Sequence, residues 1–396
     1  MARTRIQLDE MVADPLGALA RARAAAPVAE FGLGDGAGVL RYESVRALLA
    51  DGRLRANFPD FLRALGITSG RFFDWMALSP LNRDGEEHQR WRHLMSRTFT
   101  PRRVEAIRPF LRAAAHGLID AFADAGACEF MADFADRYPS LGLCELIGVP
   151  HEDRDRFRGW ADTIGLGFSP LLLAQRIDEV DAALEQLLAY TAELAAARRA
   201  APRDDLVSRI AVAAAEDGWS DFEVHGFIAG LVFAGHETTK NQLGWMVAVL
   251  AERPDVWEGV ADGRFTPAAV VEEVLRHRGA VTAVGRTATE AVDVEGERLE
   301  AGTQVTMSLW SAAHDESAWP SPDAVDPEGN AGVPHLAFGH GAHHCLGAAL
   351  ARAELQEALA ALSARLGCPR VAAGAAWKPP IGITGPERLP IRFLAR

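Results

Sequence analysis

The sequence predicts a single, mainly α-helical domain with small β-sheets, spanning residues 1–396. Apolar residues recur at spacings of three and four from about residue 83 to residue 260, which is the period of an amphipathic helix. After residue 278 the pattern changes to short Val- and Thr-rich runs separated by glycines, which is typical of strands joined by turns. No Ser/Pro-rich linker interrupts the chain, so one large domain is favoured over two.

The clearest periodic segments are expected to form long helices over residues 102–125, 171–199 and 219–251. The third helix begins near Asp221, and Pro254 ends it because the residue before a proline disfavours the helical region. At about 1.5 Å per residue this helix reaches ~45 Å, enough to cross the domain. Strands are expected over residues 281–305 and 382–394.

The composition is that of a globular protein, with 49% hydrophobic and 24% charged residues. A net charge of −13 argues against a general nucleic-acid binder. Residues 1–23 carry charges throughout, unlike a signal peptide, and no run reaches the roughly 18 apolar residues that a membrane span needs. The four cysteines are widely spaced without a CxxC pair, which argues against a disulfide framework. We therefore expect a cytoplasmic protein with no membrane partner, and place Arg23 at its surface.

The strongest chemical signal is a glycine-rich loop over residues 338–347 that contains Cys345. Glycines let backbone amides approach a thiolate closely, and the helix predicted over residues 348–366 adds positive partial charge at its N-terminus. A thiolate held in this way is suited to bind a metal. Three neighbouring histidines suggest zinc as an alternative, but structural zinc sites usually draw on two paired clusters, and no second cluster is visible. A buried structural cysteine is the other alternative, which the glycines disfavour.

This loop resembles that of the haem-thiolate monooxygenases, the cytochrome P450 superfamily, whose pattern is Phe-x-x-Gly-x-x-x-Cys-x-Gly. The match runs through Phe338, Gly341, Cys345 and Gly347. The resemblance implies a haem b bound between this loop and the long helix, with Cys345 on the iron and Gly339 among the contacts. It also implies insertion of one oxygen atom from O2 into a hydrophobic small molecule, with electrons from an external ferredoxin-type partner.

A second motif, residues 234–239, lies inside the helix predicted over 219–251. Glycine costs ~1 kcal/mol in a helix and threonine can bond back to a carbonyl one turn earlier, so a local opening that admits water is tolerated. Apolar residues on both sides indicate a buried helix interior and not a surface cap. The resemblance implies haem contacts for Ala234 and Gly235, and a proton relay through Glu237 and Thr238.

Cationic side chains are expected to bind the two haem propionates, and arginine suits them through its fixed fork of N–H groups. His88 and Arg92 are one turn apart on a helix predicted to begin near Glu86, so they face the same way. The resemblance implies that both contact the propionates, together with Arg286 and His343. Any one of these residues alone would be interpreted as a solvated surface group.

Glu273 and Arg276 resemble the family's Glu-x-x-Arg pair, a buried structural pair with no chemical step. Members commonly add an arginine from an Asp-Pro-x-Arg-Phe stretch upstream of the cysteine loop. Residues 326–330 lack that arginine. We expect His335 or another arginine to substitute for it.

Pocket residues inferred from the resemblance are mainly apolar and aromatic, which fits a hydrophobic ligand. They are Phe72, Phe73, Trp75, Met76, Phe168, Gly230, Phe233, Val281, Val284, Ile381 and Ile383. A basic patch for an acidic ferredoxin is expected from Arg90, Arg97, Arg102 and Arg103.

Two alternatives to the monooxygenase remain. One is a haem-thiolate enzyme of another reaction class, such as a peroxygenase or a C–C or ring-forming oxidase of natural-product (secondary) metabolism. The other is a non-enzymatic haem sensor. The intact acid and alcohol pair at Glu237 and Thr238 favours oxygen activation.

Overall fold

The computed structural model describes residues 3–31 and 36–396 and is mainly helical, as the sequence predicts. The α-helices are α1 (Leu8–Ala13), α2 (Pro15–Ala25), α3 (Tyr42–Leu49), α4 (Phe58–Ala64), α5 (Arg71–Leu78), α6 (Gly85–Thr98), α7 (Pro101–Asp120), α8 (Tyr138–Ile147), α9 (Arg154–Gly165), α10 (Leu173–Ala200), α11 (Leu206–Glu216), α12 (Asp221–Ala251), α13 (Pro254–Ala261), α14 (Pro267–His277), α15 (Leu309–Ala313) and α16 (Ala348–Arg365). A 3-10 turn at Leu166–Phe168 precedes α10.

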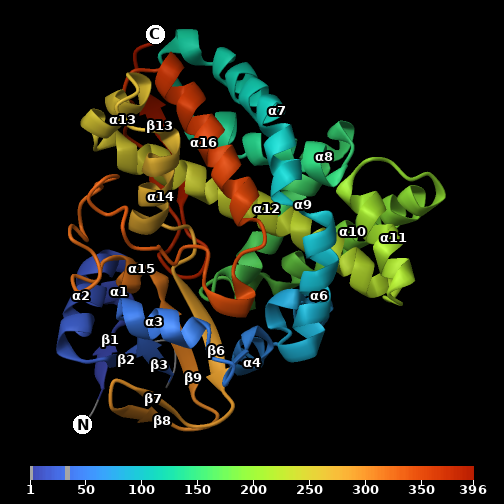
Figure 1. Ribbon diagram of the computed structural model, residues 1–396, viewed down its shortest axis with the longest axis vertical. Helices are drawn as coiled ribbons and strands as arrows, with labels where there is room; N and C mark the ends of the chain where they lie inside the picture. The colour runs from blue at the N-terminus through green and yellow to red at the C-terminus, as the bar shows by residue number, and fades with distance from the viewer. Residues whose placement is uncertain (1–2, 32–35) are drawn as a thin grey trace.

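The strands are short and gather mainly in one sheet. They are β1 (Thr4–Ile6), β2 (Val28–Phe31), β3 (Ala37–Val39), β4 (Leu54–Ala56), β5 (Ala127–Glu129), β6 (Ala283–Ala288), β7 (Val292–Val294), β8 (Glu297–Leu299), β9 (Gln304–Ser308), β10 (Arg370–Val371), β11 (Ala376–Trp377), β12 (Pro386–Arg388) and β13 (Pro390–Arg392). The largest sheet has the order β1-β2-β3-β9-β6-β4, so strands from residues 4–56 and 283–308 meet in it. Figure 1 shows this sheet at one end of the molecule and the long helices at the other.

The longest helix, α12, crosses the middle of the helical part (Figure 1). Ser220 caps it by accepting a hydrogen bond from the backbone N–H of Glu223, while the Glu223 side chain accepts one from the Ser220 N–H. The helix ends at Ala251, before Pro254 begins the next one. Its 31 residues confirm the long helix predicted from the sequence.

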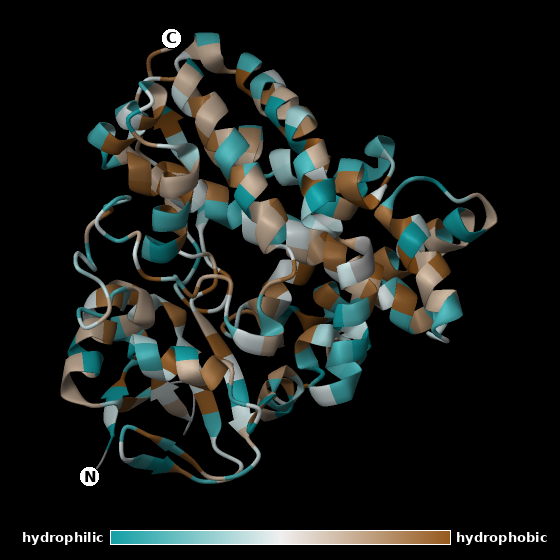
Figure 2. Ribbon diagram, viewed as in Figure 1, coloured by the Kyte–Doolittle hydropathy of each residue, from teal (hydrophilic) through white to brown (hydrophobic). Residues whose placement is uncertain are grey.

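Helices α7 and α16 lie side by side (Figure 1). Helix α16 packs against α12, α7 packs against α8, and all four helices share one apolar core. Figure 2 shows hydrophilic and hydrophobic residues alternating along α7, as expected for a helix with one buried face. Because α16 follows the cysteine loop directly, the core that holds α12 also fixes the end of that loop. Within the described ranges, the chain has no helix of the length and apolarity that crossing a membrane requires.

Candidate active site

The loop that carries Cys345 is a tight turn. The Cys345 N–H donates a 2.8 Å hydrogen bond to the Phe338 carbonyl. Gly339 and Gly341 have positive φ angles of 69° and 72°. A β-carbon at Gly341 would lie 2.8 Å from the Cα atom of Ala50. Both glycines are therefore required by backbone conformation, and Gly341 by space as well.

Cys345 is accessible to solvent, but many protein atoms lie around its thiol. The residue is exposed, yet burial is the largest influence on its thiol and raises the thiol pKa. The backbone N–H groups of Gly347 and Ala348 and the charges of Arg92 and Arg352 act in the opposite direction. Ala234, in the middle of α12, is also exposed. The sulfur thus meets both an accessible space and groups that favour a thiolate.

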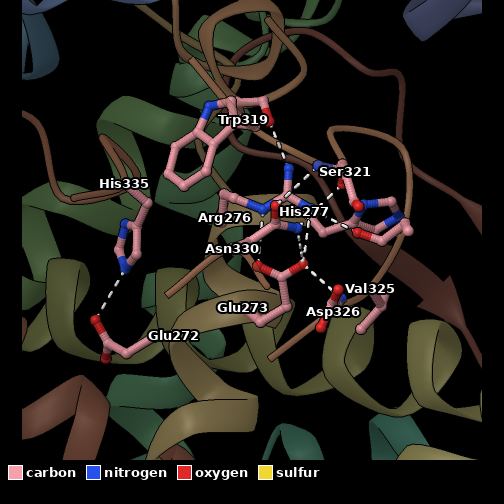
Figure 3. Close-up of polar contacts among 12 residues, drawn as sticks. Glu272, Glu273, Arg276, His277, Trp319, Ser321, Val325, Asp326, Asn330 and His335 are labelled. Carbon is pink, nitrogen blue, oxygen red and sulfur yellow. Dashed lines mark hydrogen bonds and ion pairs between the residues drawn. The ribbon is translucent and has the colours of Figure 1, made fainter. Parts of the chain in front are cut away.

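A charged group supports the cysteine loop from α14. Arg352 lies over the Phe338 ring, 4.5 Å from Cζ to the ring centroid. Its guanidinium donates to Glu272 at 2.7 and 2.9 Å. The same carboxylate lies 3.1 Å from His335 Nε2 (Figure 3). Although burial opposes it, His335 and Arg352 lower the pKa of Glu272 to about 2. Glu272 and Arg352 were not predicted, since two residues 80 positions apart share no local sequence pattern.

The four residues predicted to bind propionates are partly brought together. The His88 and His343 rings lie 4.1 Å apart, centroid to centroid. Arg92 donates to the His344 carbonyl at 3.0 Å, which ties α6 to the cysteine loop. Arg286 on β6 is buried and donates to the carbonyl of Gly285.

The charge of this group is unbalanced toward the positive. The carboxylate that contacts it is Asp84, whose Oδ1 is 2.8 Å from His343 Nε2. Burial, followed by the neighbouring His343 and Arg92, lowers the pKa of His88 to about 4. Burial also lowers the pKa of Arg286. Arg286 is buried, Arg92 is half-buried, and the low pKa of His88 keeps its ring neutral. Two arginines with Asp84 as the described carboxylate beside the group favour an anionic ligand.

Glu237 and Thr238 are adjacent on α12 but have different partners. Thr238 Oγ1 donates to the Ala234 carbonyl at 2.6 Å, the back-bond expected from the sequence. The helix is continuous there, without the local opening that the motif tolerates. Glu237 is buried, and its carboxylate accepts from Asn241 Nδ2 at 2.9 Å and pairs with Lys240 and Lys378.

Beside Glu237, three further side chains place possible metal ligands together. One ligand atom from each of Asp136, Asp162 and His236 lies within 4.8 Å of the others. The Lys240 ammonium contacts Asp162 and lies 3.6 Å from Asp136 Oδ1. A cation is therefore already supplied by the chain, and we assign no metal to these residues.

Glu273 and Arg276 form the buried pair that the sequence predicts, joined at 2.8 Å through both guanidinium contacts (Figure 3). The expected third partner is wrong. Asn330 Nδ2 donates to Glu273 Oε1 at 2.9 Å, whereas His335 contacts the neighbouring Glu272. The Asp326 N–H adds a second donor to Glu273 Oε1 at 2.8 Å. An amide and a backbone N–H thus complete the carboxylate without a further charge.

Several predicted pocket residues meet in an aromatic cluster. Phe168 stacks on Phe233 with centroids 4.8 Å apart and meets the edge of Phe72 at 5.7 Å. Trp75 meets Phe233 at 6.2 Å. Phe58, which the sequence analysis did not single out, lies 5.3 Å from Phe168. These rings come from α4, α5, the turn before α10, and α12.

The other predicted pocket residues have varied surroundings. Met76 is buried. A β-carbon at Gly230 would lie in ordinary contact with Trp75, 3.7 Å from its ring. Val281 forms an isolated bridge with Ile383. Phe73 lies instead against the Arg63 guanidinium. Val284 and Ile381 are half-buried.

The arginines expected to form a basic patch are mostly engaged. Arg90 lies over Trp219 and donates to a backbone carbonyl. Arg103 pairs with Asp204 at 2.9 Å. Arg102 is exposed. The Arg97 side chain lies outside the described residues.

The Cytochrome P450 family model matches residues 267–364, which include the Glu273 pair and Cys345. Luteothin monooxygenase of Streptomyces thioluteus is 35% identical over 90% of this chain and 87% of its own length. Mycinamicin IV hydroxylase/epoxidase of Micromonospora griseorubida is 37% identical over 89% of this chain and 88% of its length. The chain belongs to the cytochrome P450 family.

Solved P450 structures share the whole fold. P450BioI, solved with an acyl carrier protein ligated to hexadec-9Z-enoic acid, has a TM-score of 0.89 at 29% identity, covering 97% of this chain and 100% of the other. SgvP, described as a putative thioether synthase, has a TM-score of 0.86 at 33% identity, covering 99% and 100%. Membership of the family makes this protein a monooxygenase that uses a haem-thiolate cofactor. The accessible Cys345 and the unbalanced cations around Arg286 fit that cofactor.

Proposed function

We propose that this P450 inserts one oxygen atom from O2 into a hydrophobic small molecule of secondary metabolism, using haem b bound through Cys345. The observation that carries the proposal is the accessible Cys345, together with the buried Arg286 and the half-buried Arg92 near His88. Relatives named for luteothin, mycinamicin IV and nocardicin C support the substrate class.

Each predicted cofactor contact has a separate role in this proposal. Arg92 and Arg286 neutralise the propionates, and His88 and His343 complete the same group. Cys345 would hold the iron, while Phe338, Gly339 and Gly347 shape its loop. On α12 the exposed Ala234 leaves room for the haem, whereas the side of Gly235 that lacks a side chain faces Leu143 of α8. When bound, the haem supplies O2 activation, which thiolate donation favours.

The chain itself supplies protons and excludes water. Glu237 carries protons into the site, and the Thr238 hydroxyl passes them on at the active-site side of α12. Phe72, Trp75, Phe168 and Phe233 form an apolar wall that takes up the substrate.

A ferredoxin-type protein is the proposed electron donor, with Arg102 among the exposed cations available to it. A second candidate is an oxidation that closes a ring or forms a bond to sulfur. Structural relatives described as a putative thioether synthase and as an enzyme for C-S bond formation favour this candidate.

The test combines spectroscopy with a ligand screen. The reduced carbon monoxide complex of the wild-type protein should absorb at the wavelength that names the family, and Cys345→Ser should lose that band. If Cys345→Ser keeps the band, the ligand assignment is wrong. Candidate natural products are then screened for a low-spin to high-spin shift, and product analysis separates oxygen insertion from ring or C–S bond formation.

A further inference from the structure

Lys240 and Lys378 are the lysines of this chain, whose other basic side chains are arginines and histidines. Both contact Glu237. Lys240 Nζ lies 3.1 Å from Oε2, and Lys378 Nζ contacts Oε1. The carboxylate they share is 2% exposed. Both lysines therefore serve one buried acid, which is the proposed proton carrier.

The two lysines differ in what else they hold. Lys240 is on α12 itself and divides its charge among Glu237, Asp162 of α9 and Asp136. Lys378 follows β11, 141 residues after Glu237, and its ammonium contacts the Glu237 carboxylate. Its side chain is one-quarter exposed. Lys378 thus reaches from the solvent side to the buried carboxylate.

The hairpin that carries Lys378 is fixed to α12. Trp377 stacks on Trp245 of α12 with ring centroids 4.8 Å apart. The Lys378 N–H donates to the Gly385 carbonyl at 2.9 Å, and Thr384 Oγ1 donates to the Lys378 carbonyl at 3.3 Å. A backbone anchored at both its N–H and its carbonyl presents the ammonium in one place.

We propose that Lys378 is a positioning residue of the proton relay, which anchors the Glu237 carboxylate on the hairpin side of α12 and keeps it ionised between transfers. The inference rests on the proposed function, because it assigns a partner to the acid of that relay. It adds a residue from the β11–β12 hairpin to a relay whose two other members, Glu237 and Thr238, lie on α12.

Charges on every side of Glu237 decide its protonation. Burial raises the pKa of Glu237, Lys240 and then Lys378 lower it, and Asp162 raises it; the net result is a lowered pKa. Beyond these groups, Asp136 contacts His236 at 3.2 Å and Arg158 at 3.0 Å. The Lys240 ammonium contacts or lies near three carboxylates. Removal of Lys378 therefore leaves the buried Glu237 carboxylate with only part of one positive charge to balance it. Its pKa should then rise.

The test is the pH midpoint of the Glu237 carboxyl group, measured by infrared difference spectroscopy of the holoprotein. The band is assigned by its absence in Glu237→Gln. Lys378→Met should raise the midpoint by about 1–3 pH units, and Lys378→Arg should keep it low. Lys378→Gln, which retains a donor without charge, replaces Lys378→Met if that variant folds poorly. Arg388→Met is the matched control, because Arg388 is an exposed cation of the same hairpin.

Turnover gives a second measurement. The pH profile of the fraction of electrons that reach product should move in the same direction as the infrared midpoint in Lys378→Met and stay in place in Arg388→Met. An unchanged midpoint in Lys378→Met and Lys378→Gln, or an equal change in Arg388→Met, overturns the inference. Normal coupling in Glu237→Gln would instead remove the relay from the proposed function, while the infrared midpoint would still report whether Lys378 governs this carboxylate.

Discussion

Asn330 donates from Nδ2 to Glu273 Oε1 at 2.9 Å, and the same amide also donates to the Ser321 carbonyl at 3.0 Å. It therefore joins α14 to the long segment before the cysteine loop. Arg276 binds that segment too, through the carbonyls of Pro322 and Ala324. Glu273, Arg276 and Asn330 thus hold the segment together (Figure 3). Arg253 adds a further contact, because its guanidinium donates to the Val325 carbonyl.

Asn330→Ala should destabilise the protein by ~1.5–3 kcal/mol, because it removes a hydrogen bond to a buried charged group. Asn330→Asp should cost more, since a second carboxylate would face Glu273. Urea unfolding of the holoprotein measures both variants. An Asn330→Asp variant as stable as the wild type would contradict this role for the amide.

Much of the fold follows from local patterns. The helix α12 has a capping residue, a long apolar period and a proline after its end, so its limits were predictable. Strands β1 to β4 were not predicted, because three or four residues are too few to show alternation. β3 pairs with β9 and β4 pairs with β6, so both depend on residues some 250 positions away.

The candidate site divides in the same way. Cys345 and its glycines form one continuous motif, so the sequence identifies them. Asn330 and Lys378 act on Glu273 and Glu237 from 57 and 141 positions away, and no spacing rule connects them. An asparagine or a lysine outside helices and strands also has many ordinary roles, so the sequence alone does not identify Asn330 or Lys378 as part of the site.

Thr238→Ala should leave haem binding intact but divert electrons to peroxide or water, because the hydroxyl on the active-site side of α12 is lost. Glu237→Gln should slow O2 activation through loss of a proton carrier. The measurements are product formed per electron consumed and the rate of peroxide release. Normal rate and coupling in both variants would show that protons arrive by another route.

A buried histidine should make the protein sensitive to acid. His314 is buried, lies 2.9 Å from the Trp310 carbonyl through Nδ1 and 3.2 Å from Arg278 through Nε2. Burial lowers its pKa to about 3, although the Trp310 carbonyl opposes this. Below pH 6.5 the unfolded chain therefore binds a proton at His314 that the folded protein does not. The contribution of the neutral His314 to the free energy of unfolding is present above pH 6.5 and is lost as the pH falls toward 3.

The expected loss between pH 7 and pH 5 is roughly 2 kcal/mol from this residue. His314→Gln, which is neutral throughout, should show a smaller drop over the same interval, whatever its stability at pH 7. Urea unfolding of both proteins at the two pH values measures the difference. Equal drops would mean that His314 does not resist protonation in the folded protein.

Arg92→Ala and Arg286→Ala should lower haem occupancy and speed haem release, because each removes a charged donor worth ~1.5–3 kcal/mol to a propionate. His88→Ala should have a milder effect, since its low pKa keeps the imidazole neutral.

Arg23, expected at the surface, is 5% exposed and donates to the carbonyls of Ser311 and His314, so it is no control. Arg298 is the control, because its side chain is 70% exposed and pairs only with Glu300 among the ion pairs described. Haem-to-protein ratio and release rate are measured for all four variants. Equal haem retention in Arg298→Ala, Arg92→Ala and Arg286→Ala would mean that Arg92 and Arg286 do not bind the propionates.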